Sequence, residues 1–210
     1  MRDTLPLAAT RAMLIAVAER VVASTDLLTA ADQAIGDGDH GIGMRRGFAA
    51  ILDQLQGPPA ATIQALVRSA GMTIMSKTGG AAGAVFGTFF IAGSAAFADR
   101  KEIDGASFAD FLHRGLEGVE KRGGAKEGQK TMIDALAPAA RAAADCRQET
   151  LPVVVRAAAE AAATGVEATK GMIAATGKAR TLGKRALGHA DPGALSLSLI
   201  LAAMRNFLAA

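Results

Sequence analysis

The sequence predicts an all-α protein, and three observations lead to this fold class. Half of its 210 residues are hydrophobic but only 4% are aromatic, so the core must be built mainly from Ala, Leu, Ile, Val and Met. Ala and Leu are the strongest helix formers. No segment shows the strict alternation of a half-buried strand, and the glycines gather between the apolar segments. A chain of this length buries one large core, so we expect a single domain over residues 1–210.

The first four predicted helices are bounded by glycine and proline. Residues 6–32 form a long amphipathic segment that stops before GDGDHGIG, and residues 43–56 run from there to the Gly-Pro-Pro of residues 57–59. Residues 61–77 follow and stop at KTGGAAG. Residues 82–98 lie in an uncharged segment long enough to span a membrane, but it is mostly Gly, Ala, Thr and Ser. We therefore expect a buried helix there rather than a membrane span.

The fifth and sixth predicted helices lie on either side of a glycine-rich loop. Residues 107–122 begin at Ser107, and Asp110 three residues later completes the pattern of a capping box. The pair Gly123-Gly124 ends this helix. The loop KRGGAKEG then leads into a helix predicted over residues 129–145.

The last two predicted helices begin at prolines. Thr150 precedes residues 151–176, which Gly177 ends, and Asp191 precedes residues 192–208. Proline is favoured in the first turn of a helix, as at both of these starts. Helices joined by short loops run antiparallel, so glycine loops that are distant in the sequence meet at one end of a bundle. That end is the candidate site.

Composition excludes several classes of function. The formal net charge is only +3, and the basic residues are interspersed with acidic ones without interleaved aromatics, which argues against a nucleic-acid partner. The single cysteine, Cys146, cannot form an intramolecular disulfide. The N-terminal MRDTLPLAATR lacks the apolar core of a signal peptide. We expect a cytoplasmic protein with no membrane partner.

The stretch GDGDHG, from Gly36 to Gly41, matches the dinucleotide-binding fingerprint G-x-G-x-x-G. That fingerprint needs a strand before the first glycine and an acidic residue about twenty positions later on the next strand. Neither is predicted here, and Asp37 and Asp39 would repel a pyrophosphate. The aspartates must serve another purpose.

Three carboxylates lie within eight residues: Asp32, Asp37 and Asp39. Asp32 is near a predicted helix C-terminus, where the helix dipole disfavours an anion, so the cluster requires a cation. Oxygen-only ligands select Mg²⁺ or Ca²⁺. The EF-hand pattern fails from Asp37 onwards, because its twelfth position is Phe48 instead of Glu, and we therefore favour Mg²⁺. The alternative is a solvated Asp-Gly turn.

The loop KTGGAAGA supports the magnesium hypothesis, because its backbone N–H groups lie at a predicted helix start, where phosphates bind. Phosphoryl transfer mainly needs metal ions, backbone donors and a few cations around the phosphates. The cations of residues 178–185 could face a nucleotide or form a solvated surface, and His40 could donate to a phosphate or be merely exposed.

Four motifs together resemble the nucleotide-binding L subunit of bacterial dihydroxyacetone kinases, and the resemblance spans nearly the whole chain. In chain order they are AADQAIGDGDHGIGMRRGF, SKTGGAAGAVFGTFF, RGGAKEGQKTMIDAL and LGHADPGALS. The resemblance implies an antiparallel eight-helix barrel with a nucleotide site formed by loops at one end.

The resemblance also implies a role for individual residues. Two Mg²⁺ ions would be held by Asp32, Asp37 and Asp39. ADP or ATP would be contacted by His40, Gly41, Ile42, Gly43, Ala81, Ala82, Gly123, Met132, Lys178, Asp191, Pro192 and Gly193. The chain departs from the family at Ala82, which replaces a serine, at Lys126 and Gln129, which replace acidic residues, and at Lys178, which replaces an arginine. Lysine keeps the charge but loses the bidentate fork.

In this family the chain is half of a kinase, so no catalytic residue is expected in it. A separate K subunit holds the ketose through a histidine that forms a hemiaminal. Some members use ATP directly, and others keep bound ADP that a phosphotransferase-system protein rephosphorylates. The departures in the phosphate loops favour ATP and a ketose such as dihydroxyacetone or erythrulose. A nucleotide-responsive regulatory module and a helical scaffold are the alternatives, and a homodimer is left open.

Overall fold

The computed structural model describes residues 3–210 and confirms the all-α class. The described part of the chain folds into nine α-helices, two 3₁₀ segments and one pair of two-residue strands. The helices are α1 (Leu7–Ala23), α2 (Thr25–Ile35), α3 (His40–Leu55), α4 (Ile63–Lys77), α5 (Gly80–Gly93), α6 (Gly105–Gly123), α7 (Ile133–Asp145), α8 (Leu151–Thr169) and α9 (Pro192–Ala209). The other elements are β1 (Leu5–Pro6), η1 (Ser94–Phe97), β2 (Glu102–Ile103) and η2 (Lys178–Ala186).

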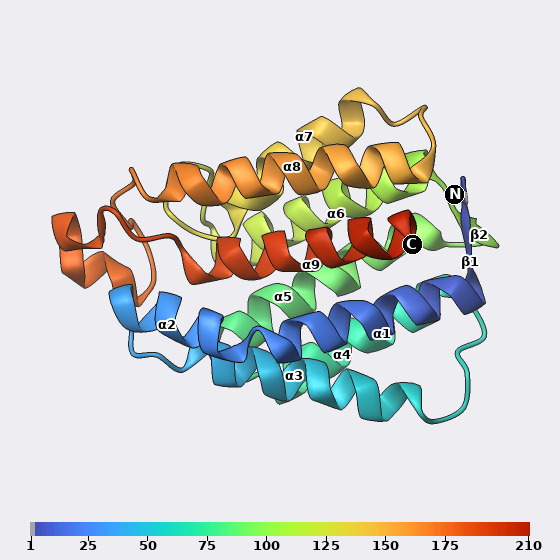
Figure 1. Cartoon of the computed structure of the whole chain (residues 1–210), viewed down its shortest axis with the longest axis horizontal. Coiled ribbons are helices and arrows are strands. Elements are labelled where there is room, and N and C mark those ends of the chain that lie inside the picture. The colour runs from blue at the N-terminus through green and yellow to red at the C-terminus, as the bar shows by residue number, and fades with distance from the viewer. Residues whose placement is uncertain (1–2) are drawn as a thin grey trace.

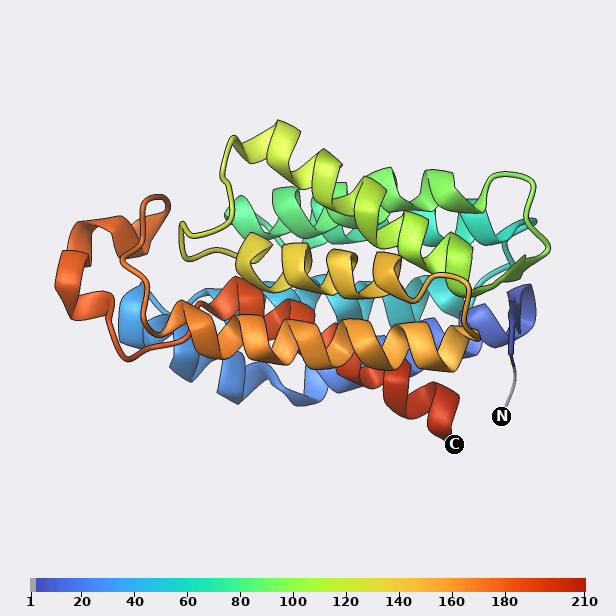
Figure 2. The same ribbon diagram turned by 90° about the horizontal axis from the view of Figure 1, so that it is seen from above.

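The helices lie side by side along the long axis of the molecule (Figure 1). Contacts between neighbours run from α1 to α3, α4, α5, α6, α7, α8 and α9, and return from α9 to α1. The strands β1 and β2 pair antiparallel at the end that carries the N- and C-termini. The loops after α2, α4, α6 and α8 lie at the opposite end, where η2 projects beyond the helices (Figure 2). Glycine loops distant in the sequence are therefore at the same end of the bundle.

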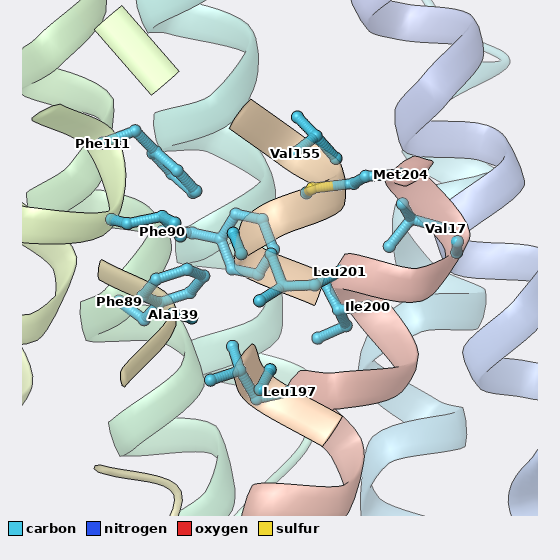
Figure 3. Close-up of a cluster of buried hydrophobic side chains, with 14 of the residues drawn as sticks. Val17, Phe89, Phe90, Phe111, Ala139, Val155, Leu197, Ile200, Leu201 and Met204 are labelled. Atoms are coloured by element: carbon cyan, nitrogen blue, oxygen red, sulfur yellow. The ribbon is translucent and has the colours of Figure 1, made fainter. Parts of the chain in front are cut away.

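The core is a single cluster of buried hydrophobic residues, to which all nine α-helices of the described chain contribute. Figure 3 shows part of this cluster, with Val17 from α1, Val155 from α8, and Leu197 and Leu201 from α9. The few aromatic residues are concentrated at one place in this core. There Phe111 meets Phe89 edge-to-face at 5.0 Å and stacks on Phe97 at 5.5 Å.

Two segments are long and apolar enough to cross a membrane by length and composition alone: Gly80–Phe97 and Pro192–Ala209. In the fold they lie against other helices, and 44% and 50% of their residues are buried inside the protein. Core helices of a folded domain pass the same test. The burial of Phe86, Phe89 and Phe90 agrees with the buried helix expected over residues 82–98.

Several predicted helix boundaries were wrong: α3 begins at His40 instead of residue 43, and α5 ends at Gly93 instead of residue 98. At three further boundaries a side-chain hydrogen bond explains the difference. The helix predicted over residues 6–32 is broken at Ser24, whose hydroxyl donates to the Arg20 carbonyl at 2.8 Å. The helix predicted over residues 151–176 ends at Thr169, whose hydroxyl accepts from the Asp191 N–H at 3.0 Å. The sixth predicted helix begins at Ile133 instead of residue 129, because the Asp134 carboxylate accepts from the Thr131 N–H at 2.7 Å.

The predicted capping box was also misplaced. The N-cap of α6 is Asp104, whose carboxylate accepts from the Ser107 N–H at 2.7 Å, while the Ser107 hydroxyl accepts from the Asp104 N–H at 2.9 Å. Asp110 instead forms an ion pair with Arg147. The predicted cap at Asp191 is confirmed, because its carboxylate accepts from the Ala194 N–H at 2.7 Å.

Replacing Gly165 by Ala should destabilise the fold by about 1–3 kcal/mol, because the backbones of α7 and α8 are in close contact there. A Cβ atom at Gly165 would meet the Asp134 carbonyl and lie 2.9 Å from the Ala135 Cα, both of which are backbone. Urea unfolding measures the effect. Gly171→Ala is the control, since its Cβ would only reach the Ala168 carbonyl at 3.7 Å. Equal unfolding midpoints for the two variants would contradict this packing.

Candidate nucleotide and metal site

A cavity of about 450 Å³ opens at the loop end of the bundle. This volume is within the range of small-molecule sites. Its walls come from the α2–α3 loop, the α4–α5 loop, the α6–α7 loop and the segment between α8 and α9. The apolar part of the lining includes Val85, Phe86, Val119, Met132 and Ile133. The site therefore combines an apolar wall with polar groups from these loops.

The carboxylates of Asp32, Asp37 and Asp39 converge on this cavity. Oxygen atoms of the three side chains lie within 4.8 Å of one another. Asp32, in the last turn of α2, is only 8% exposed, and its Oδ2 accepts from the His40 N–H at 3.1 Å. Gly38 turns the chain between the other two acids with φ of +80°, a conformation that favours glycine. Carboxylate oxygens are the protein ligands that Mg²⁺ takes, so these three residues could hold such an ion.

Lys178 neutralises part of this charge. Its ammonium group donates to the Asp37 carboxylate and, at 3.3 Å, to the Asp39 carboxylate. The hydrogen bond from Lys178 lowers the pKa of Asp37, and the same bond raises the pKa of Lys178. The acidic cluster thus already attracts a cation, and Lys178 reaches it from the first position of η2.

The α4–α5 loop presents backbone donors to the same cavity. The helix α5 starts at Gly80 with no side-chain cap, and Gly79 precedes it with φ of +78°. Ala81 and Ala82 line the cavity in the first turn of α5. The N–H groups of a first helical turn have no partners within the helix, and together with the helix dipole they bind anions. Ala82 contributes no hydroxyl, so the backbone is what this turn offers.

His40 begins α3 and faces α9 across the cavity. Its Nε2 lies 2.7 Å from the hydroxyl of Ser196, and its ring centre is 6.4 Å from that of Phe86. Burial lowers the pKa of His40, although Asp32 and Asp39 oppose this shift. The hydrogen bond to Ser196 fixes the orientation of the imidazole against α9.

A buried lysine ties two walls of the cavity together. Lys130 is only 2% exposed, and its ammonium donates to the carbonyls of Thr169 at 2.5 Å and His189 at 2.6 Å. Its φ of +57° is unusual for a residue other than glycine. Burial lowers its pKa, and the carboxylates of Asp191 and Asp134 oppose the shift. Lys130 thereby connects the α6–α7 loop with the segment before α9.

The two carboxylates beside Lys130 are held by backbone donors. Asp134 accepts from the N–H groups of Gly128 and, at 2.7 Å, Thr131. Asp191 is the N-cap of α9, and burial raises its pKa to about 7. These contacts fix the loops that carry Met132 and Gly193.

The structure brings most of the predicted site residues into one cavity. Those that line it are Asp32, Asp37, Asp39, His40, Gly43, Ala81, Ala82, Gly123, Met132, Lys178, Asp191, Pro192 and Gly193. Gly41 and Ile42 do not line it. Gly41 packs against α2, where a Cβ atom would lie 2.6 Å from the Thr29 nitrogen, and Ile42 is 53% exposed on α3.

Several residues of the lining were not predicted from the sequence. The polar ones include Arg46, Thr78 and Lys130. Arg46 of α3 donates to the Thr78 carbonyl, and Lys130 donates to the carbonyl of Thr169 at the end of α8. Lys130 lies two residues after the glycine loop KRGGAKEG, and its position next to Thr131-Met132 was a usable signal that it belongs to the site. Arg46 had no signal beyond its place shortly after GDGDHG.

Comparison with known proteins identifies the class. The DAK2 domain family matches residues 34–206. The ADP-binding subunit DhaL of PEP-dependent dihydroxyacetone kinase 1 from Listeria innocua is 42% identical over 186 residues, which cover 89% of each chain. The L-erythrulose kinase of Pectobacterium atrosepticum is 35% identical over 202 residues, 94% of this chain and 34% of that enzyme.

The fold agrees with a solved structure of this class. The dihydroxyacetone kinase from C. freundii, in complex with AMP-PNP and Mg²⁺, superposes with a TM-score of 0.76 and 29% identity over 95% of this chain. The chain spans about a third of that kinase, covering 34% of its length. These proteins are kinases or kinase subunits. The chain belongs to the DAK2 domain family and, within it, to the DhaL subunits of dihydroxyacetone kinases.

Proposed function

We propose that the chain is the nucleotide-binding subunit of a ketose kinase, which carries a Mg-bound adenine nucleotide to dihydroxyacetone or a related short ketose held by a separate K subunit. One observation carries the proposal: three carboxylates, an uncapped helix start and an apolar wall converge on one cavity. The closed sequence of helix contacts from α1 round to α9 supports the eight-helix barrel that the resemblance implied.

Each part of the cavity has a task in this function. Asp32, Asp37 and Asp39 would hold two Mg²⁺ ions, which neutralise phosphate charge when bound. The first N–H groups of α5 bind phosphate oxygens, and the wall that includes Phe86 and Met132 excludes water from the base. The resemblance places the ketose on a separate K subunit, so the phosphoryl acceptor would come on that partner.

The remaining nucleotide contacts are proposed as the resemblance placed them. His40 and Gly43 begin α3 beside the acids, Gly123 and Met132 flank the α6–α7 loop, and the turn Asp191-Pro192-Gly193 closes the cavity. Gly41 and Ile42 lie outside the cavity lining, and they would support the start of α3 instead.

Two sources of the phosphoryl group are candidates: bound ADP that is rephosphorylated, and ATP used directly. The Listeria relative, which matches this chain along 89% of its own length, is named as the ADP-binding subunit of a PEP-dependent kinase. This favours bound ADP that a phosphotransferase-system protein rephosphorylates. The relative named L-erythrulose kinase favours a related ketose as the acceptor. The departures at Ala82 and Gln129 favour direct use of ATP.

The isolated chain should phosphorylate no ketose, and addition of a K-type subunit should restore transfer to dihydroxyacetone or erythrulose. The assay is run once with ATP alone and once with phosphoenolpyruvate and phosphotransferase-system proteins, which separates the two donors. Ketose turnover by the isolated chain would show the proposal to be wrong. Nucleotide binding without transfer with any K-type subunit and either donor would instead indicate a regulatory module.

A further inference from the structure

We propose that Arg46 is a further phosphate-binding residue, whose guanidinium group contacts the phosphate chain of the nucleotide beside the start of α5. The inference rests on the proposed function, because it names an additional contact in the same cavity. Arg46 lies on α3, directly after Arg45. Successive residues of a helix point about 100° apart, and of the adjacent pair Arg45 and Arg46 only Arg46 lines the cavity.

The guanidinium of Arg46 lies against the α4–α5 loop. Its Nη2 donates to the Thr78 carbonyl at 3.0 Å, and a Cβ atom on Gly79 would be only 3.4 Å from the same nitrogen. Gly79 is the residue that precedes α5, so the positive group lies where the unpaired N–H groups of the first turn begin. A helix start and an adjacent guanidinium both attract an anion.

Arg46 differs from the other cationic side chains of the cavity in its partners. Within residues 3–210, the lysines and arginines that line it are Arg46, Lys130 and Lys178. Lys130 is buried and donates to two backbone carbonyls, and Lys178 is paired with Asp37 and Asp39. Arg46 makes no ion pair within 4.0 Å in the described part of the chain, although the acidic cluster lines the same cavity.

The chemistry of arginine suits a phosphate at this place. A guanidinium has five N–H donors in a planar fork, and the bond to Thr78 uses one nitrogen, so the other donors remain for a phosphate. Arginine binds phosphate bidentately, whereas the ammonium of Lys178 is a point charge. Because Ala82 adds no hydroxyl to the turn, a charged side chain such as Arg46 can add contacts on this side of the phosphates.

The test compares ADP with adenosine, in Mg²⁺, on the parent and two variants. Arg46→Gln should weaken ADP about ten- to a hundredfold, the usual effect of losing a charge-assisted hydrogen bond, and leave adenosine binding within about twofold. Arg45→Gln, which changes the neighbouring exposed arginine, should leave both affinities unchanged. Circular dichroism confirms that the variants fold. Unchanged ADP affinity in Arg46→Gln, or equal weakening of ADP and adenosine, would overturn the inference.

A second readout separates direct contact from support of the loop. The Nε–H resonance of Arg46 in the parent protein, identified by its absence from the spectrum of Arg46→Lys, should shift on addition of Mg-ADP and not on addition of adenosine. No shift with ADP would overturn the inference even if the affinity falls, because support of Thr78 alone would produce that combination. If the parent protein binds no Mg-nucleotide at all, the proposed function itself fails, and this contact with it.

Discussion

Asp37→Asn should fold normally but reduce phosphoryl transfer, measured with a K-type subunit, by several orders of magnitude. Asp37 lies between Asp32 and Asp39 in the sequence, and its carboxylate is within 4.8 Å of both, so we expect it to contact both metal ions. Asn keeps the size and the turn propensity but removes the charge. Metal ions and positioned donors supply most of the catalysis in this chemistry, so a weakened metal site removes most of the rate.

The fold should tolerate this change because Asp37 is exposed. Its ion pair with Lys178 is on the surface, where such pairs contribute little to stability. Asp53→Asn is the matched control, since Asp53 is an exposed acid on α3 that does not line the cavity. The comparison needs circular dichroism, ADP affinity in Mg²⁺ and the transfer rate. If Asp37→Asn works like the parent, GDGDHG is only a turn.

Lys130→Met should lower the free energy of unfolding by about 3–5 kcal/mol, which is typical of removing one partner from a buried charged cluster. The variant leaves the carbonyls of Thr169 and His189 without their donor, and it leaves Asp134 and Asp191 without a neighbouring cation. Nucleotide affinity should fall as well, because Lys130 holds two walls of the cavity together.

Urea unfolding of Lys130→Met is compared with that of Lys121→Met. Lys121 is exposed in the last turn of α6, so its replacement should cost less than about 0.5 kcal/mol. Loss of Lys130 should affect Asp191 most directly. Burial already raises the pKa of Asp191 to about 7, and the charge of Lys130 opposes this rise. Equal unfolding midpoints for the two variants would mean that the bonds of Lys130 are replaced by water and that the cluster does not hold the loops.

Some boundaries that depend on neighbouring residues could be predicted from the sequence, although the local break at Ser24 and the local cap at Asp104 were not. The cap at Asp191 and the stop at Gly123-Gly124 are local, and α6 indeed ends at Gly123, with Gly124 in the left-handed conformation. The end of α8 depends on a hydrogen bond between Thr169 and Asp191, which are far apart in the sequence, so no local pattern could reveal it.

The same distinction applies to the site. The acids at positions 32, 37 and 39 are close in the sequence, so their spacing alone was enough to recognise them as a cluster. The spacing of residues could not reveal Lys130 and Arg46, because their hydrogen-bond partners are distant in the sequence. Lys130 donates to the carbonyls of Thr169 and His189, and Arg46 donates to the carbonyl of Thr78. The partners of these two side chains are seen only in the folded structure.

Titration of the purified chain with ADP, once in Mg²⁺ and once in EDTA, tests the magnesium–nucleotide site most directly. Three carboxylates cannot face phosphates without a cation between them, so ADP should bind in Mg²⁺ and not measurably in EDTA. The bound state should be stabilised by about 3 kcal/mol at a hundredfold excess over the dissociation constant, seen as a rise in melting temperature only in Mg²⁺. Equal ADP affinity in the two buffers would contradict the metal site and the function built on it.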